Sequence, residues 1–404
     1  MPGALRLAIL GTRGIPAAYG GFETFAEQLA RRLAARGHDV TVFGRAGSVP
    51  ESLHRTRFEG VRLLVLPAPR SKYLETVAHT LRAARVAADE RFDFVLLCNS
   101  ANFLCLPILR ASGARVALAI DGIESARRKW GVAGRTFYRL AERVGPWLAD
   151  ATIADCEVIR AVYERRGARR LEMIAYGAEP PRSTGTATLE RVGVRPRGYV
   201  LYVSRLEPEN NADVVITAYR AARPPLDLVV VGDAPYADSF KARLRVLAAG
   251  DPHIHFTGFL FGTGYDELRA HAALYVQATD VGGTHPALLE AMAAGLPIVA
   301  NDIPEHREVL GETGWYYAKN SADDLAARLR ELLGEAAVGR GAVVEDRAGD
   351  DADGAGTAPD EADRRRAAMR AERAQAALAR VRERYDWERV TSAYEELARR
   401  LVGA

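Results

Sequence analysis

Residues 5–33 read LRLAILGTRGIPAAYGGFETFAEQLARRL. The apolar run of residues 5–10 predicts a buried strand, and the apolar spacing of residues 22–33 predicts an amphipathic helix. The glycine-rich turn between them leaves bare backbone at the start of the helix, where a phosphate or a sugar can approach. This order of elements is typical of the opening half of a βαβ unit and predicts an α/β protein.

The glycines of this turn favour a ligand site over a purely structural turn, which is the alternative for any isolated glycine pair. Gly20 and Gly21 stand together at the entrance of the helix, with Arg13 upstream and Glu23 one turn inside. They are not spaced as G-x-G-x-x-G, so the dinucleotide fingerprint is absent and a simple dehydrogenase is disfavoured.

The length of 404 residues exceeds one ordinary core, and we expect two domains. Hydrophobic residues make up 48% of the chain and charged residues 26%, which is ordinary for a globular protein. Cys98, Cys105 and Cys156 lack C-x-x-C spacing and are interpreted as core thiols of a cytoplasmic protein. No apolar run is long enough to span a bilayer, so we expect a cytoplasmic protein that is either soluble or peripheral at the inner face of the cell membrane.

Charge is distributed unevenly, with net +9 in residues 1–180 and −6 in residues 181–404. A basic cluster in the first part suggests a surface for anionic lipid or phosphate, and a solvated helix face is the alternative. Nucleic acid is disfavoured because no interleaved aromatic residues or nucleic-acid motif accompany the cluster. The cluster consists of Arg127, Arg128, Lys129, Arg135, Arg139, Arg143, Arg165, Arg166, Arg169 and Arg170.

Short apolar runs separated by helical patterns fill both halves of the chain. They predict two Rossmann-like doubly wound domains that face each other across a cleft, with the ligand at the carboxyl ends of the strands. Expected strands are 40–43, 63–66, 94–98, 116–120, 152–154 and 171–174 in the first half, and 199–203, 228–231, 254–257, 274–276, 298–300 and 315–317 in the second. The expected units are a first domain at 1–178, a linker at 179–198, a second domain at 199–333, an acidic disordered insertion at 334–364 and helices at 365–404, the last docking on the first domain.

The insertion has almost no large apolar residue, which is the composition of disorder. Asp350, Asp351 and Asp353 resemble an acidic metal-binding motif, but solubility is the favoured explanation. We expect no metal site.

The second half contains the sharper motifs. Arg205 follows the strand at 199–203 and is suited to bidentate contact with a pyrophosphate. Gly282, Gly283, Thr284 and His285 precede a helix and present N–H groups to an anion. Glu290 lies one turn inside that largely apolar helix, where a buried carboxylate needs a partner such as a ribose.

These motifs resemble the retaining glycosyltransferases of family 4, which have the GT-B fold. The resemblance rests on Arg205, on residues 290–297 (EAMAAGLP) and on residues 304–309 (PEHREV). Within the family, residues 11–16, 19–24, 206–211 and 282–286 resemble the bacterial L-rhamnosyltransferase branch, which assembles cell-wall and capsular polysaccharides. The resemblance implies a nucleoside-diphosphate sugar donor, dTDP-L-rhamnose, an acceptor sugar on a polyprenyl diphosphate lipid, and no cofactor.

Several positions depart from the family pattern. Asn210 replaces a lysine and Gly282 replaces the first glutamate of a paired-carboxylate motif, and the rhamnosyltransferase branch shares both changes. Asp121 occupies the place of a histidine that faces the donor sugar in the family. Ser125 stands where a bulky aromatic residue is expected, which bears on the identity of the acceptor.

The resulting assignment has catalytic, donor-binding and acceptor-side groups. Arg205 stabilises the leaving diphosphate, while Asp121 or Glu124 orients the acceptor hydroxyl. A nucleotide-sugar epimerase and a noncatalytic binding subunit are the alternatives. The donor-binding residues are Gly20, Gly21, Arg205, Gly282, Gly283, Thr284, His285 and Glu290, and the acceptor-side residues are Arg13, Tyr19, Glu23, Arg127 and Lys129.

Overall fold

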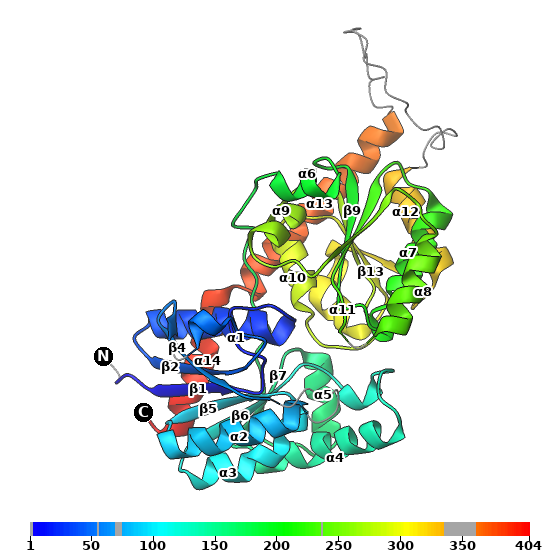
Figure 1. Ribbon diagram of the computed structural model, residues 1–404. Coiled ribbons are helices and arrows are strands. Elements are labelled where there is room, and N and C mark those ends of the chain that lie inside the picture. Colours follow the sequence, from blue (N-terminus) through cyan, green and yellow to red (C-terminus); the bar gives the residue numbers. More distant parts are fainter. Residues whose placement is uncertain (1–2, 55, 69–74, 236, 335–360) are drawn as a thin grey trace.

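The computed structural model describes residues 3–54, 56–68, 75–235, 237–334 and 361–404. Two α/β domains lie one above the other, each built on a mainly parallel sheet with helices on both faces (Figure 1). This arrangement confirms the predicted fold class of two doubly wound domains.

The first domain contains an eight-stranded sheet in the order β3-β4-β2-β1-β5-β6-β7-β8. All neighbours are parallel except β3 and β4, which pair antiparallel. Parallel strands are covered on both faces, which explains why β5 is an uninterrupted apolar run and why both β5 and β7 are buried along their whole length. The strands are β1 (Arg6–Leu10), β2 (Asp39–Arg45), β3 (Arg57–Phe58), β4 (Val61–Leu66), β5 (Phe94–Cys98), β6 (Arg115–Ile120), β7 (Ala151–Ala154) and β8 (Leu171–Met173).

Helices cover both faces of this sheet. Helix α1 buries Phe25, Leu29 and Leu33 at helical spacing, as its sequence pattern predicts. The helices are α1 (Gly21–Ala35), α2 (Glu75–Glu90), α3 (Leu106–Ala111), α4 (Val132–Leu148) and α5 (Glu157–Arg165), with short 3₁₀ helices η1 (Glu51–Leu53), η2 (Ser100–Cys105) and η3 (Glu124–Ala126).

The second domain contains a six-stranded parallel sheet in the order β11-β10-β9-β12-β13-β14. Its strands are β9 (Tyr199–Val203), β10 (Asp227–Val231), β11 (Ile254–Gly258), β12 (Leu274–Gln277), β13 (Ile298–Asn301) and β14 (Trp315–Tyr317). Its helices are α6 (Ala187–Val192), α7 (Ala212–Ala222), α8 (Asp238–Ala248), α9 (Thr263–His271), α10 (Pro286–Ala293), α11 (Pro304–Leu310) and α12 (Ala322–Leu333), with η4 (Pro208–Asn210) and η5 (Gly311–Thr313). Helix α6 lies inside the predicted linker and packs against α9.

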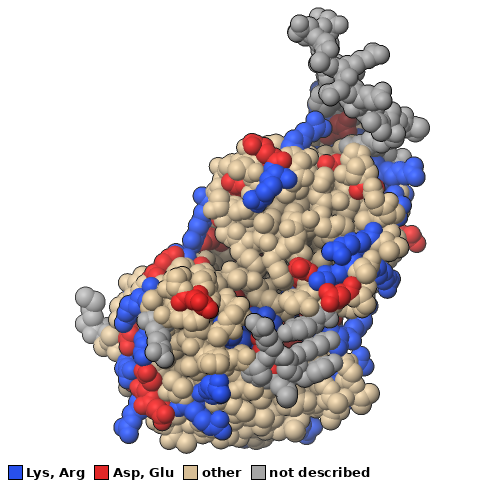
Figure 2. Space-filling model, viewed as in Figure 1, with Lys and Arg blue, Asp and Glu red and all other residues tan. Residues whose placement is uncertain are grey.

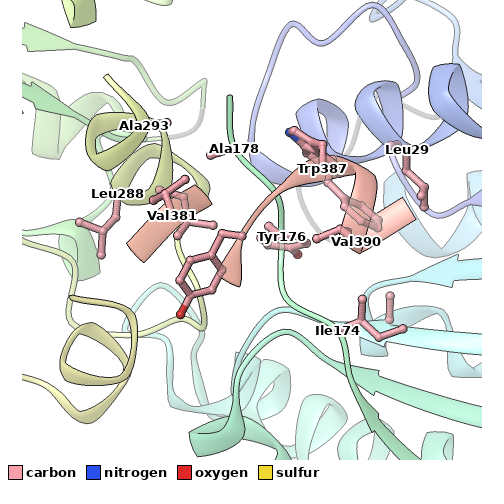
Figure 3. Packing of buried hydrophobic residues seen from close by; sticks show 14 of the residues in the cluster. Leu29, Ile174, Tyr176, Ala178, Leu288, Ala293, Val381, Trp387 and Val390 are labelled. Atoms are coloured by element: carbon pink, nitrogen blue, oxygen red, sulfur yellow. The ribbon is translucent and has the colours of Figure 1, made fainter. Parts of the chain in front are cut away.

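Two C-terminal helices, α13 (Glu361–Arg384) and α14 (Trp387–Val402), connect the domains again. Helix α13 packs on α10 of the second domain, and α14 packs on α1 of the first. The chain thus crosses between the domains twice, once after β8 and once between α13 and α14. At these two crossings the backbone N–H of Ala178 donates to the carbonyl of Tyr385 at 2.8 Å. The two segments therefore lie side by side, and Trp387 and Tyr176 pack there (Figure 3).

Most of the predicted insertion, including Asp350, Asp351 and Asp353, lies outside the described residues, and residues 361–364 begin α13. Among the described helices, none is both long and apolar enough to cross a membrane. Cys98, Cys105 and Cys156 are buried and form no disulfide with one another.

Candidate active site

A cavity of about 590 Å³ lies between the two domains, at the carboxyl ends of their strands. Both domains line it, as the predicted layout requires. The predicted residues that line it are Tyr19, Gly20, Gly21, Asp121, Arg127, Arg205, Gly282, Gly283, His285 and Glu290. Acidic and basic side chains meet along the boundary between the domains (Figure 2).

The N-termini of α1 and α10 meet at this cavity. A Cβ atom on Gly21 would lie 3.0 Å from Cγ of Pro286, so the absence of a side chain permits this close approach. The N–H groups of Gly21 and Phe22 in α1 and of Ala287 in α10 have no hydrogen-bond partner among the described residues, and each N-terminus carries the positive end of a helix dipole. Together they form a positively polarised entrance suited to an anion that bridges the domains.

Arg205 follows β9 and lines the cavity from the second domain. Burial lowers the pKa of its guanidinium, but the nearby carboxylates, with Glu207 foremost, more than offset this and raise the pKa. Its Nη1 atom lies 3.6 Å from Oε2 of Glu207. Arg205 is therefore a charged, partly buried group positioned to meet a phosphate.

The basic triplet 127–129 lies in the domain boundary rather than on a lipid-facing surface, so this part of the expected membrane patch is wrong. Arg127 is buried, with Nε 2.5 Å from Oε1 of Glu124. Arg128 donates to Oδ1 of Asn211 at 2.7 Å, and Lys129 lies 3.3 Å from Glu207. Carboxylates and amides of the second domain attract these cations, and charge alone could not reveal this pairing.

The two candidate carboxylates of the first domain differ in placement. Asp121 lines the cavity, and burial raises the pKa of its carboxyl group although Arg127 opposes the shift. Glu124 is not among the described residues that line the cavity. Burial favours its neutral form, but Arg127 and Lys129 outweigh this and lower its pKa. Asp121 can meet a substrate directly, whereas Glu124 positions Arg127.

Asp155, which the sequence analysis missed, connects the first domain to the loop before α10. Its Oδ2 atom accepts the backbone N–H of Thr284 at 2.8 Å, and its Oδ1 atom is buried with no partner among the described residues. One N–H group predicted to bind donor phosphate is thus taken by a protein carboxylate. The position of Asp155 directly after β7 was the available signal, because that strand ends at the cleft.

Burial raises the pKa of Asp155 to about 7, although the hydrogen bond from Thr284 opposes the shift. An unfolded aspartate titrates near pH 3.9, so between about pH 4 and pH 7 the folded protein holds a proton that the unfolded chain has lost. Stability should therefore fall as pH rises through this interval.

Asp155→Asn should remove this fall of stability with rising pH, because the side-chain amide keeps an oxygen that accepts the N–H of Thr284 but does not ionise. The melting temperature of wild type relative to the variant is expected to decline between about pH 4 and pH 7 and then level off. A difference that does not change with pH would contradict the assignment.

Glu290 projects into the cavity, where Tyr265 donates its hydroxyl to Oε2 at 2.8 Å. Burial raises the pKa of Glu290, and Arg269 partly opposes the shift. Tyr265 and Arg269 also line the cavity and were not predicted, because no motif surrounds them in α9. The carboxylate is held in place and keeps acceptor capacity for a ligand hydroxyl.

An aromatic wall closes one side of the cavity. The Arg13 guanidinium carbon lies 3.6 Å from the Tyr19 ring centroid, and Tyr19 lies 6.0 Å from Phe259. Glu23 accepts the backbone N–H of Arg13 at 2.8 Å. Arg13, Glu23, Lys129 and Thr284 are not among the described cavity-lining residues, and they support the turns that line it.

His285 lines the cavity with a buried ring 4.9 Å from that of His306. Burial lowers the pKa of His285 well below its usual range, and His306 adds to the shift. The ring is therefore neutral at physiological pH. Within the described part of the chain, no three His, Cys, Asp or Glu side chains cluster as a metal site would require.

Comparison with known proteins shows to which class of enzymes the chain belongs. Residues 197–335 match the family described as "Glycosyl transferases group 1", and residues 20–177 match the family described as "Glycosyl transferase 4-like domain". Each match covers one of the two domains around the cavity. The chain belongs to the glycosyltransferases with the GT-B fold, of the family 4 type.

Two mannosyltransferases of mycobacteria are similar to the chain in sequence. The chain is 28% identical over 358 residues to the GDP-mannose-dependent alpha-(1-6)-phosphatidylinositol monomannoside mannosyltransferase of Mycobacterium tuberculosis, covering 80% of this chain and 88% of that protein. It is 32% identical to the phosphatidyl-myo-inositol mannosyltransferase of Mycobacterium leprae over 183 residues, which is 41% of this chain and 47% of that protein.

Solved structures share the fold at low sequence identity. Sucrose-phosphate synthase from Thermosynechococcus elongatus matches with a TM-score of 0.76 and 18% identity over 99% of both chains. Anabaena HepE in complex with UDP-glucose matches with a TM-score of 0.72 and 16% identity, over 97% of this chain and 99% of that one.

Proposed function

We propose that the protein transfers a hexose from a nucleoside-diphosphate sugar to a saccharide acceptor carried on a lipid, in cell-wall, capsular or other polysaccharide synthesis. The observation that carries the proposal is the cavity in which Arg205 and the N-termini of α1 and α10 converge. A diphosphate fits this combination of a guanidinium and unpaired N–H groups. The names of the mycobacterial relatives support a glycolipid acceptor.

Two nucleotide sugars are candidates for the donor substrate. The motifs at residues 11–16, 19–24, 206–211 and 282–286 favour dTDP-L-rhamnose. The mycobacterial relative is named for GDP-mannose, which favours a mannose donor. The two donors differ in both base and sugar, so a direct comparison separates them.

The proposed reaction retains the anomeric configuration. The acceptor oxygen attacks the anomeric carbon on the face from which the diphosphate departs, the bond from that carbon to the phosphate oxygen breaks, and the leaving phosphate oxygen takes the acceptor proton. Arg205 and the helix N-termini stabilise the negative charge that grows on the diphosphate. Asp121 faces the cavity and orients the acceptor hydroxyl.

A thermal-shift screen of nucleotide sugars tests the donor, with dTDP-L-rhamnose and GDP-mannose compared at equal concentration. Glu290→Gln is expected to weaken donor binding about tenfold with a smaller effect on kcat, because a ribose hydroxyl loses its carboxylate acceptor. Glu331→Gln on the outer face of α12 is the matched control and should change neither. An unchanged donor affinity in Glu290→Gln would remove the ribose contact from the proposal.

Transfer should require no metal. We expect activity to survive EDTA, because a guanidinium and backbone N–H groups perform the charge stabilisation that a divalent cation would otherwise supply. Loss of activity in EDTA that returns with Mg²⁺ or Mn²⁺ would contradict this expectation.

Product analysis with and without acceptor separates the alternatives. An epimerase would convert the nucleotide sugar without an acceptor, whereas the proposed enzyme releases a nucleoside diphosphate and lengthens the acceptor. A noncatalytic subunit would bind donor and give no product in a single-turnover assay.

A further inference from the structure

The outward face of α4 carries three large apolar side chains that remain exposed. Val132, Leu140 and Trp147 are 83%, 54% and 57% exposed. Their spacing of eight and seven residues places them on one side of the helix. Helix α4 runs along the lower edge of the first domain in Figure 1, so this stripe is part of the outer surface.

The same face is basic and lacks acidic groups. Arg135, Arg139 and Arg143 are exposed and alternate with the apolar residues at helical spacing. Among the described residues, no carboxylate lies within 4.0 Å of these three guanidinium groups. The only acidic residue of α4, Glu142, is buried and accepts hydrogen bonds from Ser125 and Arg166.

The loop before β8 extends this face. The guanidinium carbon of Arg169 lies 5.2 Å from the Trp147 ring centroid, and Arg165 and Arg170 are also exposed. The indole of Trp147 therefore lies beside the guanidinium of Arg169 and is open to solvent. We name the side chains of Val132, Arg135, Arg139, Leu140, Arg143, Trp147 and Arg169 the α4 face.

Exposed apolar side chains beside unpaired arginines are not found on every exposed helix, and helix α8 of the second domain is an example. Val246 there is 76% exposed, but two of the three basic residues of α8 are paired with carboxylates. Lys241 lies 2.9 Å from Asp233, and Arg243 lies 3.2 Å from Asp213. The α8 surface therefore offers little net positive charge to an anionic partner.

We propose that the α4 face docks on the surface of an anionic phospholipid bilayer. The unpaired arginines meet lipid phosphates, while the apolar side chains enter the boundary between headgroups and acyl chains. Arginines alone would also fit a nucleic acid, but exposed aliphatic side chains favour a lipid surface. The inference rests on the proposed function, because a lipid-linked acceptor gives the enzyme a reason to bind membrane.

Vesicle flotation of the full-length protein tests the proposal. We expect binding to phosphatidylcholine vesicles that contain phosphatidylglycerol, no binding to phosphatidylcholine alone, and release by high salt. Arg139→Glu/Arg143→Glu should weaken binding about 30-fold, and Leu140→Ser/Trp147→Ser about tenfold. Arg245→Glu/Val246→Ser on α8 is the matched control and should bind as wild type does.

Trp147 gives a second measurement. Its emission should shift to shorter wavelength on vesicle binding, and Trp147→Tyr should abolish most of that shift. Absence of binding to anionic vesicles, or binding that both α4 double variants retain, would overturn the proposal. Binding to RNA in place of vesicles would overturn it in favour of a nucleic-acid surface.

The same variants separate this inference from the proposed function. Transfer to a short soluble acceptor should be unchanged by substitutions on the α4 face, because none of its residues lines the cavity. Transfer activity without vesicle binding would refute docking alone. Vesicle binding without any sugar transfer would refute the proposed function alone.

Discussion

Arg205→Ala is expected to lower kcat by about 100-fold or more. Arg205 lies at the cavity with its charge maintained, 3.6 Å from Glu207, and it is assigned to the charge that grows on the departing diphosphate. Its contribution therefore increases between ground state and transition state, and kcat should fall more than donor affinity. Steady-state kinetics with the donor identified by the thermal-shift screen measures both.

Two control variants make this result interpretable. Arg205→Lys keeps a charge near Glu207 but loses the planar fork, so an intermediate loss of kcat is expected. Arg307→Ala removes an exposed guanidinium that pairs with Asp302, and it should leave kcat unchanged. Equal and small effects of Arg205→Ala and Glu290→Gln would refute the assignment of Arg205 to the leaving group.

Gly283→Ala is expected to reduce activity about 100-fold by keeping the domains apart. A Cβ atom at this position would lie 2.0 Å from Oδ1 and 2.2 Å from Oδ2 of Asp155, distances that no side chain can occupy. Because Asp155 is buried directly after β7, relief of the clash either displaces its carboxylate from Thr284 or moves one domain away from the other, and both changes loosen the contact between the domains. The reacting groups from the two domains would then be misaligned.

A double-mutant cycle tests this explanation. In an Asp155→Ala background the clash is absent, so adding Gly283→Ala should cost much less activity than it does in wild type. Gly131→Ala, whose Cβ atom would meet nothing within 4 Å, is the matched control. An equal loss of activity in both backgrounds would show that Gly283 is needed for the conformation of its own loop and not for the contact with Asp155.

Much of the fold follows from local patterns. Uninterrupted apolar runs marked parallel strands covered on both faces, and the order of strands and helices implied two doubly wound domains. Gly20, Gly21, Arg205 and Glu290 reach the cavity because each lies at a strand end or helix start. Such positions can be recognised in sequence, since the carboxyl edge of a parallel sheet is set by the order of its elements.

Contacts between the domains could not be predicted in this way. Arg127, Lys129 and Asp155 find their partners 78 to 129 residues further along the chain, in Glu209, Glu207 and Thr284. A run of basic residues has the same sequence pattern whether it faces solvent, lipid or a carboxylate on another domain. The division of the basic cluster into residues 127–129, which pair across the domain boundary, and the exposed α4 face therefore required the structure.

The sequence by itself determined the two-domain α/β architecture, the glycines at the helix entrances and the arginine after β9, because apolar periodicity and glycine placement act over a few residues. Three interactions were decided only by the tertiary structure. Asp155 accepts a backbone N–H of the loop before α10, Glu124 pairs with Arg127, and Tyr265 donates a hydrogen bond to Glu290. The first of these outcomes depends on how the two sheets are set against each other, and the other two depend on distances between side chains within one domain. Electrostatic and hydrogen-bonding energies between domains depend on distances that chain order does not encode.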